Sequence, residues 1–281
     1  MKLGVVLDTS VPATIASLQA RAAAAEEVGF DLLWIEPGGL LEDPIVLAGV
    51  LAPGTASIRL VAAVQAGGHP VALAEDAAVA DLSCQGRFAL AVGGDEVELL
   101  AETVDLLFRA GASAPFRHSG HRWTVPANLP ENELHEARLR VTPDPFQLEL
   151  PIWVFGPAAG SVAATRGVSL VAAAGEPDAA VAQAWRAVEQ SLGPGAARLR
   201  RPAIYPVPAR PDVEGLVRQL STKRDSFGLD IAVLRLPDGI GEDEWRRALR
   251  TIATEVRPRL QLDRLPEGLD AHWRQELHDD L

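Results

Sequence analysis

Two carboxylates and one imidazole follow apolar, strand-like runs of this sequence, where acid–base chemistry could be built. Asp8 ends the run KLGVVLD, Glu36 ends DLLWIE, and His69 comes shortly after SIRLVAAV. In a parallel sheet, the carboxyl ends of the strands meet at the end where ligand sites form. A buried carboxylate or an imidazole can transfer a proton near neutral pH. Asp8, Glu36 and His69 are therefore the candidate catalytic residues.

Each of these three residues also has a purely structural interpretation. Asp8 is placed to cap the helix that follows it, and Glu36 to form a salt bridge in its loop. His69 comes directly before Pro70, at the start of a helical pattern. The sequence leaves both interpretations open for all three.

Small and uncharged residues follow the other strand-like runs. Glycine lets the backbone approach a flat ring or a phosphate, and the N-terminus of a following helix offers free N–H groups to an anion. A tight turn into a helix explains the same residues equally well. The candidate cofactor-binding residues, including those of the turn GPAAGS (156–161), are Gln65, Gly93, Gly94, Gly156, Gly160, Ser161 and Ala174.

The elements that would position these residues alternate along the chain. Apolar strand-length runs lie at 2–8, 31–36, 57–64, 87–92, 151–155, 168–174, 201–209 and 230–237, and a helical pattern follows each. Eight such pairs predict a (β/α)8 TIM barrel, with an open doubly wound sheet as the alternative. Expected helix starts include Ser10 with Pro12, Asp43-Pro44, His69-Pro70 and a capping box of Asp95 with Glu98.

One segment breaks this alternation. Residues 111–140 show no clear period and contain His118, His121 and His135, so we expect an inserted loop after the fourth helix. We expect one barrel domain over 1–257, and a charged tail or helix over 258–281. The histidines are spaced too loosely for a helical metal pair, and we expect no metal site.

Composition excludes several classes of function. The 281 residues are 48% hydrophobic and 23% charged, as in a soluble globular domain. A net charge of −12 argues against nucleic acid as a partner. Cys84 is the only cysteine, so a disulfide within the chain is excluded. We expect Cys84 to be a small buried side chain rather than a nucleophile. The start MKLGVVLDTS indicates neither a signal peptide nor a membrane span, so we expect a cytoplasmic protein.

The order of several blocks resembles a known family. These blocks are AEEVGFDLLWIE (25–36), HPVALAEDAAVADLSCQGRFALAVGG (69–94), VTPDPFQLELPIWVFG (141–156) and FGLDIAVLRLP (227–237). Together they look like the bacterial luciferase-like family of flavin-dependent monooxygenases and deazaflavin-dependent oxidoreductases. The resemblance implies a TIM barrel with reduced FMN or a deazaflavin at its mouth and a small organic substrate above the ring. It also implies a dimer through the early helices, either a homodimer or a heterodimer with a related barrel.

The sequence departs from the family at two turns. Members commonly place a histidine just after the second strand, where this chain has Glu36-Pro37-Gly38-Gly39. Members also often extend the entry to the fourth helix, whereas Gly94 here passes directly to Asp95.

Three functional hypotheses follow. The first is a luciferase-like oxidoreductase of the monooxygenase type, and the second is a catalytically impaired barrel that serves as a binding or partner subunit. The third is an aldolase or isomerase that uses a lysine. The chain has only Lys2 and Lys223, and we expect neither at the carboxyl end of a strand.

Overall fold

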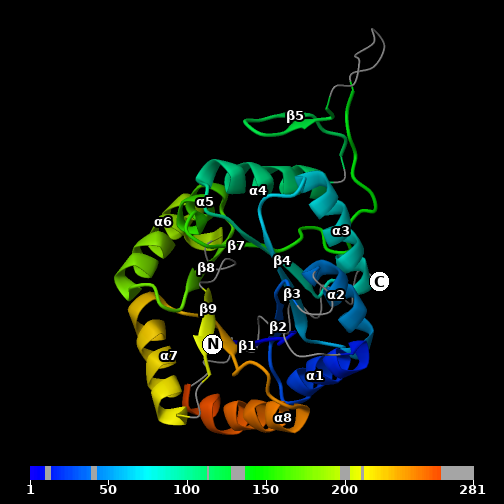
Figure 1. The fold of residues 1–281 in the computed structure, drawn as a ribbon. Coiled ribbons are helices and arrows are strands. Elements are labelled where there is room, and N and C mark those ends of the chain that lie inside the picture. Colours follow the sequence, from blue (N-terminus) through cyan, green and yellow to red (C-terminus); the bar gives the residue numbers. More distant parts are fainter. Residues whose placement is uncertain are drawn as a thin grey trace.

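The structure is a computed structural model that describes residues 1–9, 14–38, 43–112, 114–127, 137–196, 203–209 and 212–260. Within these ranges, eight parallel strands close into a barrel in the order β1-β10-β9-β8-β7-β4-β3-β2 (Figure 1). The predicted (β/α)8 fold is confirmed, and the open sheet is excluded. The barrel strands are β1 (Lys2–Val6), β2 (Leu32–Ile35), β3 (Arg59–Gln65), β4 (Phe88–Gly93), β7 (Ile152–Phe155), β8 (Ser169–Ala173), β9 (Ala203–Pro208) and β10 (Ile231–Arg235).

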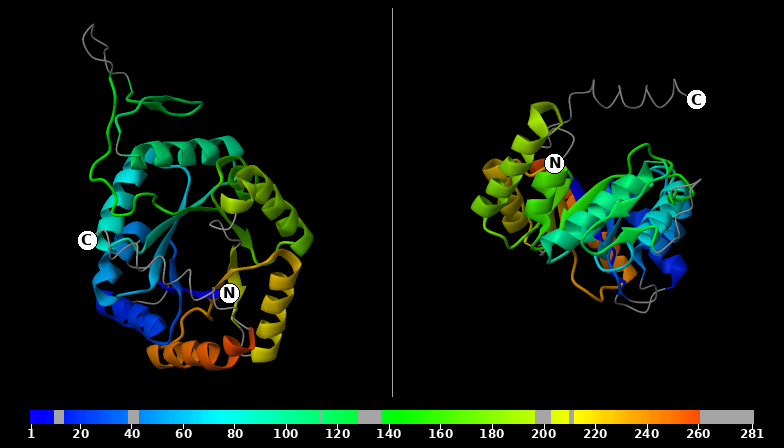
Figure 2. Two further views of the ribbon diagram at one scale, coloured as in Figure 1. Left: turned by 180° about the vertical axis from the view of Figure 1, so that it is seen from behind. Right: turned by 90° about the horizontal axis from the view of Figure 1, so that it is seen from above.

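A helix follows each barrel strand and packs on the outside of the barrel. Figure 1 looks onto the carboxyl ends of the strands, and Figure 2 shows the same ring of helices from behind and from above. The helices are α1 (Ile15–Glu27), α2 (Pro44–Leu51), α3 (Pro70–Ser83), α4 (Val97–Gly111), α5 (Ala159–Arg166), α6 (Asp178–Ala196), α7 (Val213–Phe227) and α8 (Glu242–Thr251). None of the helices in the described ranges combines the length and the apolar character that a membrane crossing requires.

The predicted starts of α2 and α3 are confirmed, whereas the N-cap of α1 is Thr14, and the predicted Ser10 and Pro12 lie outside the described residues. The Asp43 carboxylate accepts hydrogen bonds from the amides of Ile45 and Val46, at 2.8 and 3.3 Å. The His69 ring accepts one from the Val71 amide at 3.3 Å, and a proline follows each cap in the first turn. Both helices therefore begin where the sequence places them.

The predicted capping box at the start of α4 is wrong. The N-cap of α4 is Glu96 rather than Asp95, and no side chain caps this end of the helix. The helix begins one residue later than a cap at Asp95 requires, at Val97. Packing against the neighbouring helices α3 and α5 fixes α4 without a cap.

The barrel interior combines large and small side chains. Val6, Trp34, Val61 and Ala89 lie opposite one another on neighbouring strands, and all four belong to the interior cluster. Trp34 on β2 and Trp153 on β7 are the large members, while β3 and β4 contribute alanines. The small residues on β3 and β4 leave room for the two indole rings, so the interior is filled rather than hollow.

The inserted segment contains a short hairpin that the sequence did not predict. Strand β5 (His118–Ser119) pairs antiparallel with β6 (Thr124–Val125), and the hairpin projects beside α4 (Figure 1). Each strand has two residues, too few for an alternating pattern to appear in the sequence. His135 lies outside the described residues.

Barrel packing continues past α8. A π-helical turn (Ile252–Val256) and a 3-10 turn (Pro258–Leu260) follow the helix, and Leu260 is fully buried. The division between barrel and tail at 257 stays a prediction, and residues 261–281 lie outside the described ranges.

Candidate active site at the barrel mouth

The last inward-facing residue of each strand lies at the barrel mouth. Side chains along a strand point alternately into and out of the barrel. Trp34, Trp153 and Val233 face the interior, so Glu36, Phe155 and Arg235, two positions later, also face inward. By the same alternation, the structure places four predicted residues and three that sequence reasoning missed at the mouth. The four are Asp8, Glu36, Gln65 and Gly93; the three are Phe155, Tyr205 and Arg235.

Glu36 is paired with a guanidinium group. Arg235 donates hydrogen bonds to the Glu36 carboxylate and to the Tyr205 hydroxyl oxygen, the latter at 2.7 Å. A second nitrogen of Arg235 lies 3.8 Å from the Asp238 carboxylate. Glu36 is thus an ion-pair partner in this structure, which matches its structural interpretation as a salt-bridged carboxylate.

Asp8 ties the loop after β1 to the loop after β10. It is 9% exposed, and its Oδ2 accepts a hydrogen bond of 2.9 Å from the Gly239 amide. Arg21 lies 3.9 Å from the same oxygen and donates to the Ile240 carbonyl at 2.8 Å. Asp8 therefore neutralises Arg21 and holds the rim of the mouth in shape.

A cavity of about 200 Å³ lies between these charged groups. Asp8, Glu36, Arg235 and Asp238 line it together with Leu7, Thr9, Pro37 and Gly38. Residues from the ends of β1, β2 and β10 thus form one charged edge of the mouth, which we call the charged edge.

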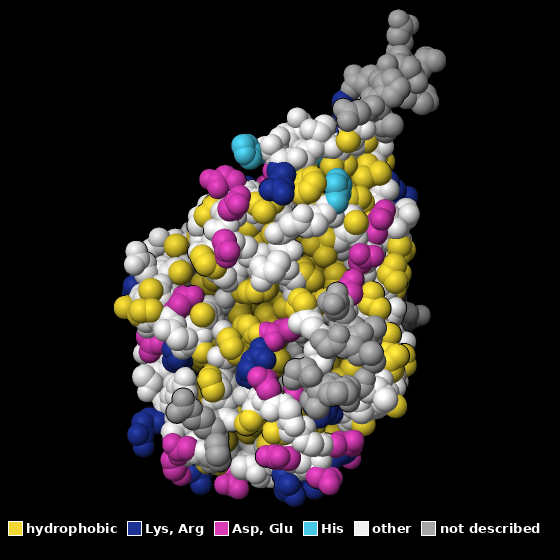
Figure 3. Space-filling view, in the orientation of Figure 1, with side chains coloured by type: hydrophobic (Ala, Val, Ile, Leu, Met, Phe, Trp, Pro, Cys, Tyr) yellow, Lys and Arg dark blue, Asp and Glu magenta, His cyan; other side chains and the backbone are white. Residues whose placement is uncertain are grey.

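Four aromatic rings lie next to the charged edge. Trp34 is fully buried, and its ring centroid lies 4.6 Å from that of Tyr205 in a stacked arrangement. The centroids of Phe155 and Trp153 lie 6.0 and 6.3 Å from that of Trp34. Phe155 and Tyr205 are partly exposed, and we call these two rings the aromatic floor; the Tyr205 ring is stacked on Trp34, whereas the Phe155 ring is edge-on to it at 73°. Figure 3 shows a hollow lined by hydrophobic side chains on this face, with acidic and basic side chains beside it.

The space over Gly93 is occupied by the chain itself. A Cβ atom on Gly93 would lie 2.5 Å from Phe155 Cζ and 2.7 Å from Gln65 Oε1. Gly93 therefore makes room for these two side chains, in the place where sequence reasoning expected a cofactor. We call this side of the mouth, built by β3, β4 and β7, the neutral side.

The turn after β7 is fastened to the end of β4. Gly156 has φ +91°, a conformation that favours glycine, and an added Cβ would lie 3.1 Å from the Gly94 carbonyl oxygen. The Ala158 amide donates to the same oxygen at 3.2 Å. Gly94 and Gly156 thus hold two neighbouring strand ends together.

The remaining predicted cofactor-binding residues lie after two different strands, Gly160 and Ser161 in α5 after β7, and Ala174 after β8. Gly160 lies in the first turn of α5, where an added Cβ would be 3.3 Å from Ala184 of α6, and Ser161 beside it is exposed. No side chain caps the N-terminus of α5. Ala174 follows β8, and its amide donates to the Tyr205 carbonyl at 3.2 Å.

His69 contacts the inserted hairpin rather than the charged edge. It is exposed, and its ring centroid lies 4.8 Å from that of Trp123 in an edge-on arrangement. Its Nδ1 also accepts the capping hydrogen bond of α3. The structure therefore does not bring His69 into contact with Asp8 or Glu36.

A buried carboxylate on α4 holds the inserted hairpin. Glu102 is 7% exposed and accepts hydrogen bonds of 2.9 Å from His118 Nε2 and from the amides of Arg122 and Trp123. Burial alone would raise the pKa of Glu102, but these hydrogen bonds outweigh it and hold the pKa below its ordinary value. An added Cβ on Gly120 would lie 2.0 Å from Glu102 Oε1, so this position requires glycine.

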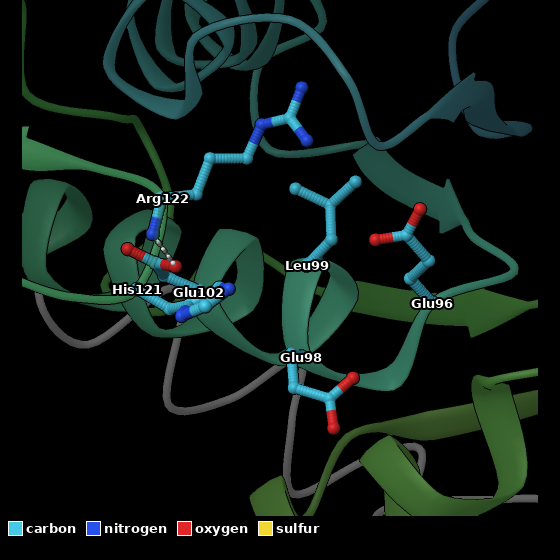
Figure 4. Close-up of a pocket in the computed structure, with 6 residues that line it drawn as sticks. All are labelled: Glu96, Glu98, Leu99, Glu102, His121 and Arg122. Atoms are coloured by element: carbon cyan, nitrogen blue, oxygen red, sulfur yellow. Dashed lines mark hydrogen bonds between the residues drawn. The ribbon is translucent and has the colours of Figure 1, made fainter.

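A second cavity, of about 430 Å³, lies between α4 and the turn of the hairpin (Figure 4). Glu96 lines it from the N-cap of α4, Glu98, Leu99 and Glu102 from α4 itself, and His121 and Arg122 from the turn. In the part of the chain that the structure describes, no three His, Cys, Asp or Glu side chains are grouped to hold a metal ion.

Two further sequence interpretations agree with the structure. Lys2 begins β1 and Lys223 lies in α7, where it pairs with Asp178 at 2.7 Å, so neither lysine is at the mouth. Cys84 is fully buried, and burial raises the pKa of its thiol to about 11, as expected of a small core residue.

A family model for the luciferase-like monooxygenases matches residues 1–276. The chain belongs to the luciferase-like monooxygenase family.

Solved structures share this luciferase-like fold at low sequence identity. Monooxygenase RslO1 from Streptomyces bottropensis is 17% identical, with a TM-score of 0.72 over 92% of this chain and 99% of that one. The oxygenating constituent of 3,6-diketocamphane monooxygenase from Pseudomonas putida, solved with FMN, is 15% identical, with a TM-score of 0.68 over 92% and 98%. The coenzyme F420 dependent tetrahydromethanopterin reductase from Methanopyrus kandleri is 14% identical, with a TM-score of 0.69 over 92% and 99%.

Sequence reasoning missed Phe155, Tyr205 and Arg235, although alternation was the available signal for all three. They lie two residues after the interior positions Trp153, Ala203 and Val233.

Proposed function

We propose that this chain is a flavin- or deazaflavin-dependent oxidoreductase of the monooxygenase type, acting on a small organic substrate at the barrel mouth. The observation that carries the proposal is the aromatic floor of Phe155 and Tyr205, open to the hollow and supported by the buried Trp34. A flat conjugated ring gains both buried area and stacking on such a surface. Family membership and similar structures described with FMN or coenzyme F420 support the same cofactor class.

The residues present fit such a cofactor with one adjustment. The uncapped N-terminus of α5 offers amides to a phosphate group, and the Gln65 amide offers a hydrogen bond at the neutral side. Phe155 must rotate before a ring can approach Gly93. When bound, the cofactor supplies the redox chemistry.

The chain's own residues orient and enclose rather than react. Phe155 and Gln65 bound the ring at the neutral side, and the paired Glu36 and Arg235 hold the opposite edge of the mouth, next to Tyr205. The hairpin brings Trp123 against His69, the N-cap residue of α3.

Binding measurements test this proposal directly. The protein is titrated with FMN, with reduced FMN under anaerobic conditions, and with a deazaflavin, and each titration is followed by calorimetry. We expect saturable binding of at least one, and weaker binding in Phe155→Ala, which removes the part of the floor at the neutral side. The matched control is Phe116→Ala, a buried aromatic of the inserted segment away from the barrel interior. Saturable binding of none of the three cofactors contradicts the proposal.

A second candidate function is a partner subunit without catalysis of its own. The observation that favours it is the space over Gly93, which Phe155 and Gln65 fill, together with Glu36 where the family commonly has a histidine. Turnover by the isolated chain with a supplied reductant removes this candidate. Stable co-purification with a related barrel, and activity only in that complex, supports it.

We also propose that the chain forms a dimer through α2 and α3, as a homodimer or with a related barrel. Val46 on α2 and Val79 and Leu82 on α3 are 51%, 52% and 41% exposed. The two helices approach closely beside them, because a Cβ on Gly49 would lie 3.9 Å from Ser83. A second apolar surface is the natural cover for this face.

Sedimentation velocity tests the dimer. We expect Val79→Glu to shift the chain from dimer to monomer, because a charge would be buried in the interface. Val97→Glu on α4, where the valine is also exposed, serves as the control. A monomeric wild-type chain contradicts the homodimer.

A further inference from the structure

Tyr205 is the only tyrosine in the chain, and it lies between the aromatic floor and the charged edge. Its ring stacks on Trp34, and its hydroxyl oxygen accepts a hydrogen bond of 2.7 Å from Arg235. The residue is partly exposed, so a ligand on the floor would meet both its ring and its hydroxyl.

The contact with Arg235 fixes the role of this hydroxyl group. A guanidinium group only donates hydrogen bonds, so the phenol oxygen must be the acceptor. Within the described residues, Oη has this one hydrogen bond, which leaves the hydroxyl proton available to a ligand. A neighbouring cation also strengthens the hydroxyl as a donor, because it stabilises negative charge on the oxygen.

The charges around Tyr205 favour an uncharged ligand. The charged edge holds three carboxylates, from Asp8, Glu36 and Asp238, and the Arg235 guanidinium group, and the guanidinium group of Arg21 on α1 lies beside Asp8. The described groups therefore carry one excess negative charge, which disfavours an anion. Glu36 and Asp8 already have cationic partners, so a cationic ligand would have to displace them.

We propose that Tyr205 is the specificity-determining hydrogen-bond donor of the mouth. Its substrate would be a flat, uncharged molecule whose carbonyl oxygen accepts a hydrogen bond from the Tyr205 hydroxyl group. The inference rests on the proposed function, since it names the substrate class of that same site. A carbonyl oxygen fits better than a hydroxyl group, because it only accepts. A buried hydroxyl would need an acceptor of its own, and the Glu36 carboxylate is engaged by Arg235.

The first experiment measures the Arg235 to Tyr205 contact without any cofactor. Tyrosine labelled with carbon-13 at Cζ gives one resonance in this chain, and its position reports ionisation of the hydroxyl. We expect Arg235→Met to move the titration midpoint upward by about one pH unit or more, because the cation that favours the phenolate is lost. Arg246→Met is the control, since Arg246 is 32% exposed against 31% for Arg235 and pairs within α8. Equal midpoints in the wild type and Arg235→Met overturn the proposed donor.

The second experiment measures the preference for a carbonyl oxygen. Binding of 1-tetralone and of tetralin, which lacks the oxygen, is measured by equilibrium dialysis. We expect the wild type to bind 1-tetralone about tenfold more tightly, as one hydrogen bond allows. In Tyr205→Phe, which keeps the stacked ring, the two affinities become about equal. If Tyr205→Phe fails to fold, Arg235→Met takes its place. This variant keeps the Tyr205 hydroxyl group, and we expect it to bind 1-tetralone over tetralin with a reduced preference.

Equal wild-type affinities for the two probes, or no saturable binding of 1-tetralone, overturn the assigned substrate class. Neither experiment contains a flavin, so their failure is separate from a failure of cofactor binding. A chain that binds FMN but shows no carbonyl preference keeps the proposed function and loses this inference. If the chain prefers 1-tetralone but binds no flavin, the ligand site at Tyr205 is supported and the proposed redox function is contradicted.

Discussion

The charged edge and the neutral side of the mouth are built by the same rule and have opposite chemistry. On both sides, an inward-facing strand residue is followed two positions later by a residue at the mouth. On the charged edge these residues are Asp8, Glu36 and Arg235, which pair with other charged groups. On the neutral side they are Gln65, Gly93 and Phe155, which pack on one another. The closed barrel thus determines where the site lies, and single residues at strand ends determine what it binds.

Removing the ring that supports the floor should have the largest effect. Trp34 is fully buried and contacts aromatic rings from three other strand positions, whereas Phe155 is partly exposed. We expect Trp34→Ala to lower the free energy of unfolding by about 3–5 kcal/mol, and Phe155→Ala by less. Urea denaturation followed by circular dichroism measures both. Equal losses would mean that the neutral side, rather than Trp34, supports the mouth.

Breaking the attachment of the inserted hairpin should have the next largest effect. An alanine Cβ at Gly120 would collide with the Glu102 carboxylate and the His118 ring. We expect Gly120→Ala to cost about 1–3 kcal/mol, because buried hydrogen bonds of Glu102 are lost. Gly68→Ala is the control, since nothing lies within 4 Å of a Cβ there. Limited proteolysis of the hairpin detects the difference, and equal cleavage of the two variants contradicts the expectation.

Acidification should release the same attachment. The folded pKa of Glu102 lies below its unfolded value of about 4.5, so its stabilisation is complete above that pH. The stabilisation is lost as pH falls below 4.5 and through the lowered folded pKa. Hydrogen exchange of the Trp123 amide should therefore accelerate at acid pH in the wild type beyond the intrinsic trend. Glu102→Gln should remove this extra dependence, and an unchanged profile would exclude Glu102 as its origin.

The smallest effect is expected for the ion pair at the charged edge. Glu36 and Arg235 are 25% and 31% exposed, and water screens such pairs. We expect Glu36→Gln to change the free energy of unfolding by less than about 1 kcal/mol in urea denaturation. A loss as large as that of Trp34→Ala would show that charge, rather than aromatic packing, stabilises the mouth.

The sequence predicted the barrel and part of the mouth for a local reason. Alternating strand and helix patterns are short-range features, and the end of a strand can be read from its own residues, which is how Asp8, Glu36, Gln65 and Gly93 were found. Partner choice is not local. Arg235 pairs with Glu36 across 199 residues of chain, and no pattern in either segment indicates the other. The hairpin escaped prediction because long-range contacts to Glu102 hold its two-residue strands.

The way in which Glu102 holds the hairpin has a consequence for protein engineering. Two of its three hydrogen bonds go to backbone amides, which every residue except proline possesses. Apart from Gly120, and from Trp123, which contacts His69, the side chains of the turn can thus be exchanged while these two hydrogen bonds are kept. The turn of this hairpin beside α4 is therefore a place where variant turn sequences can be inserted without redesigning the barrel.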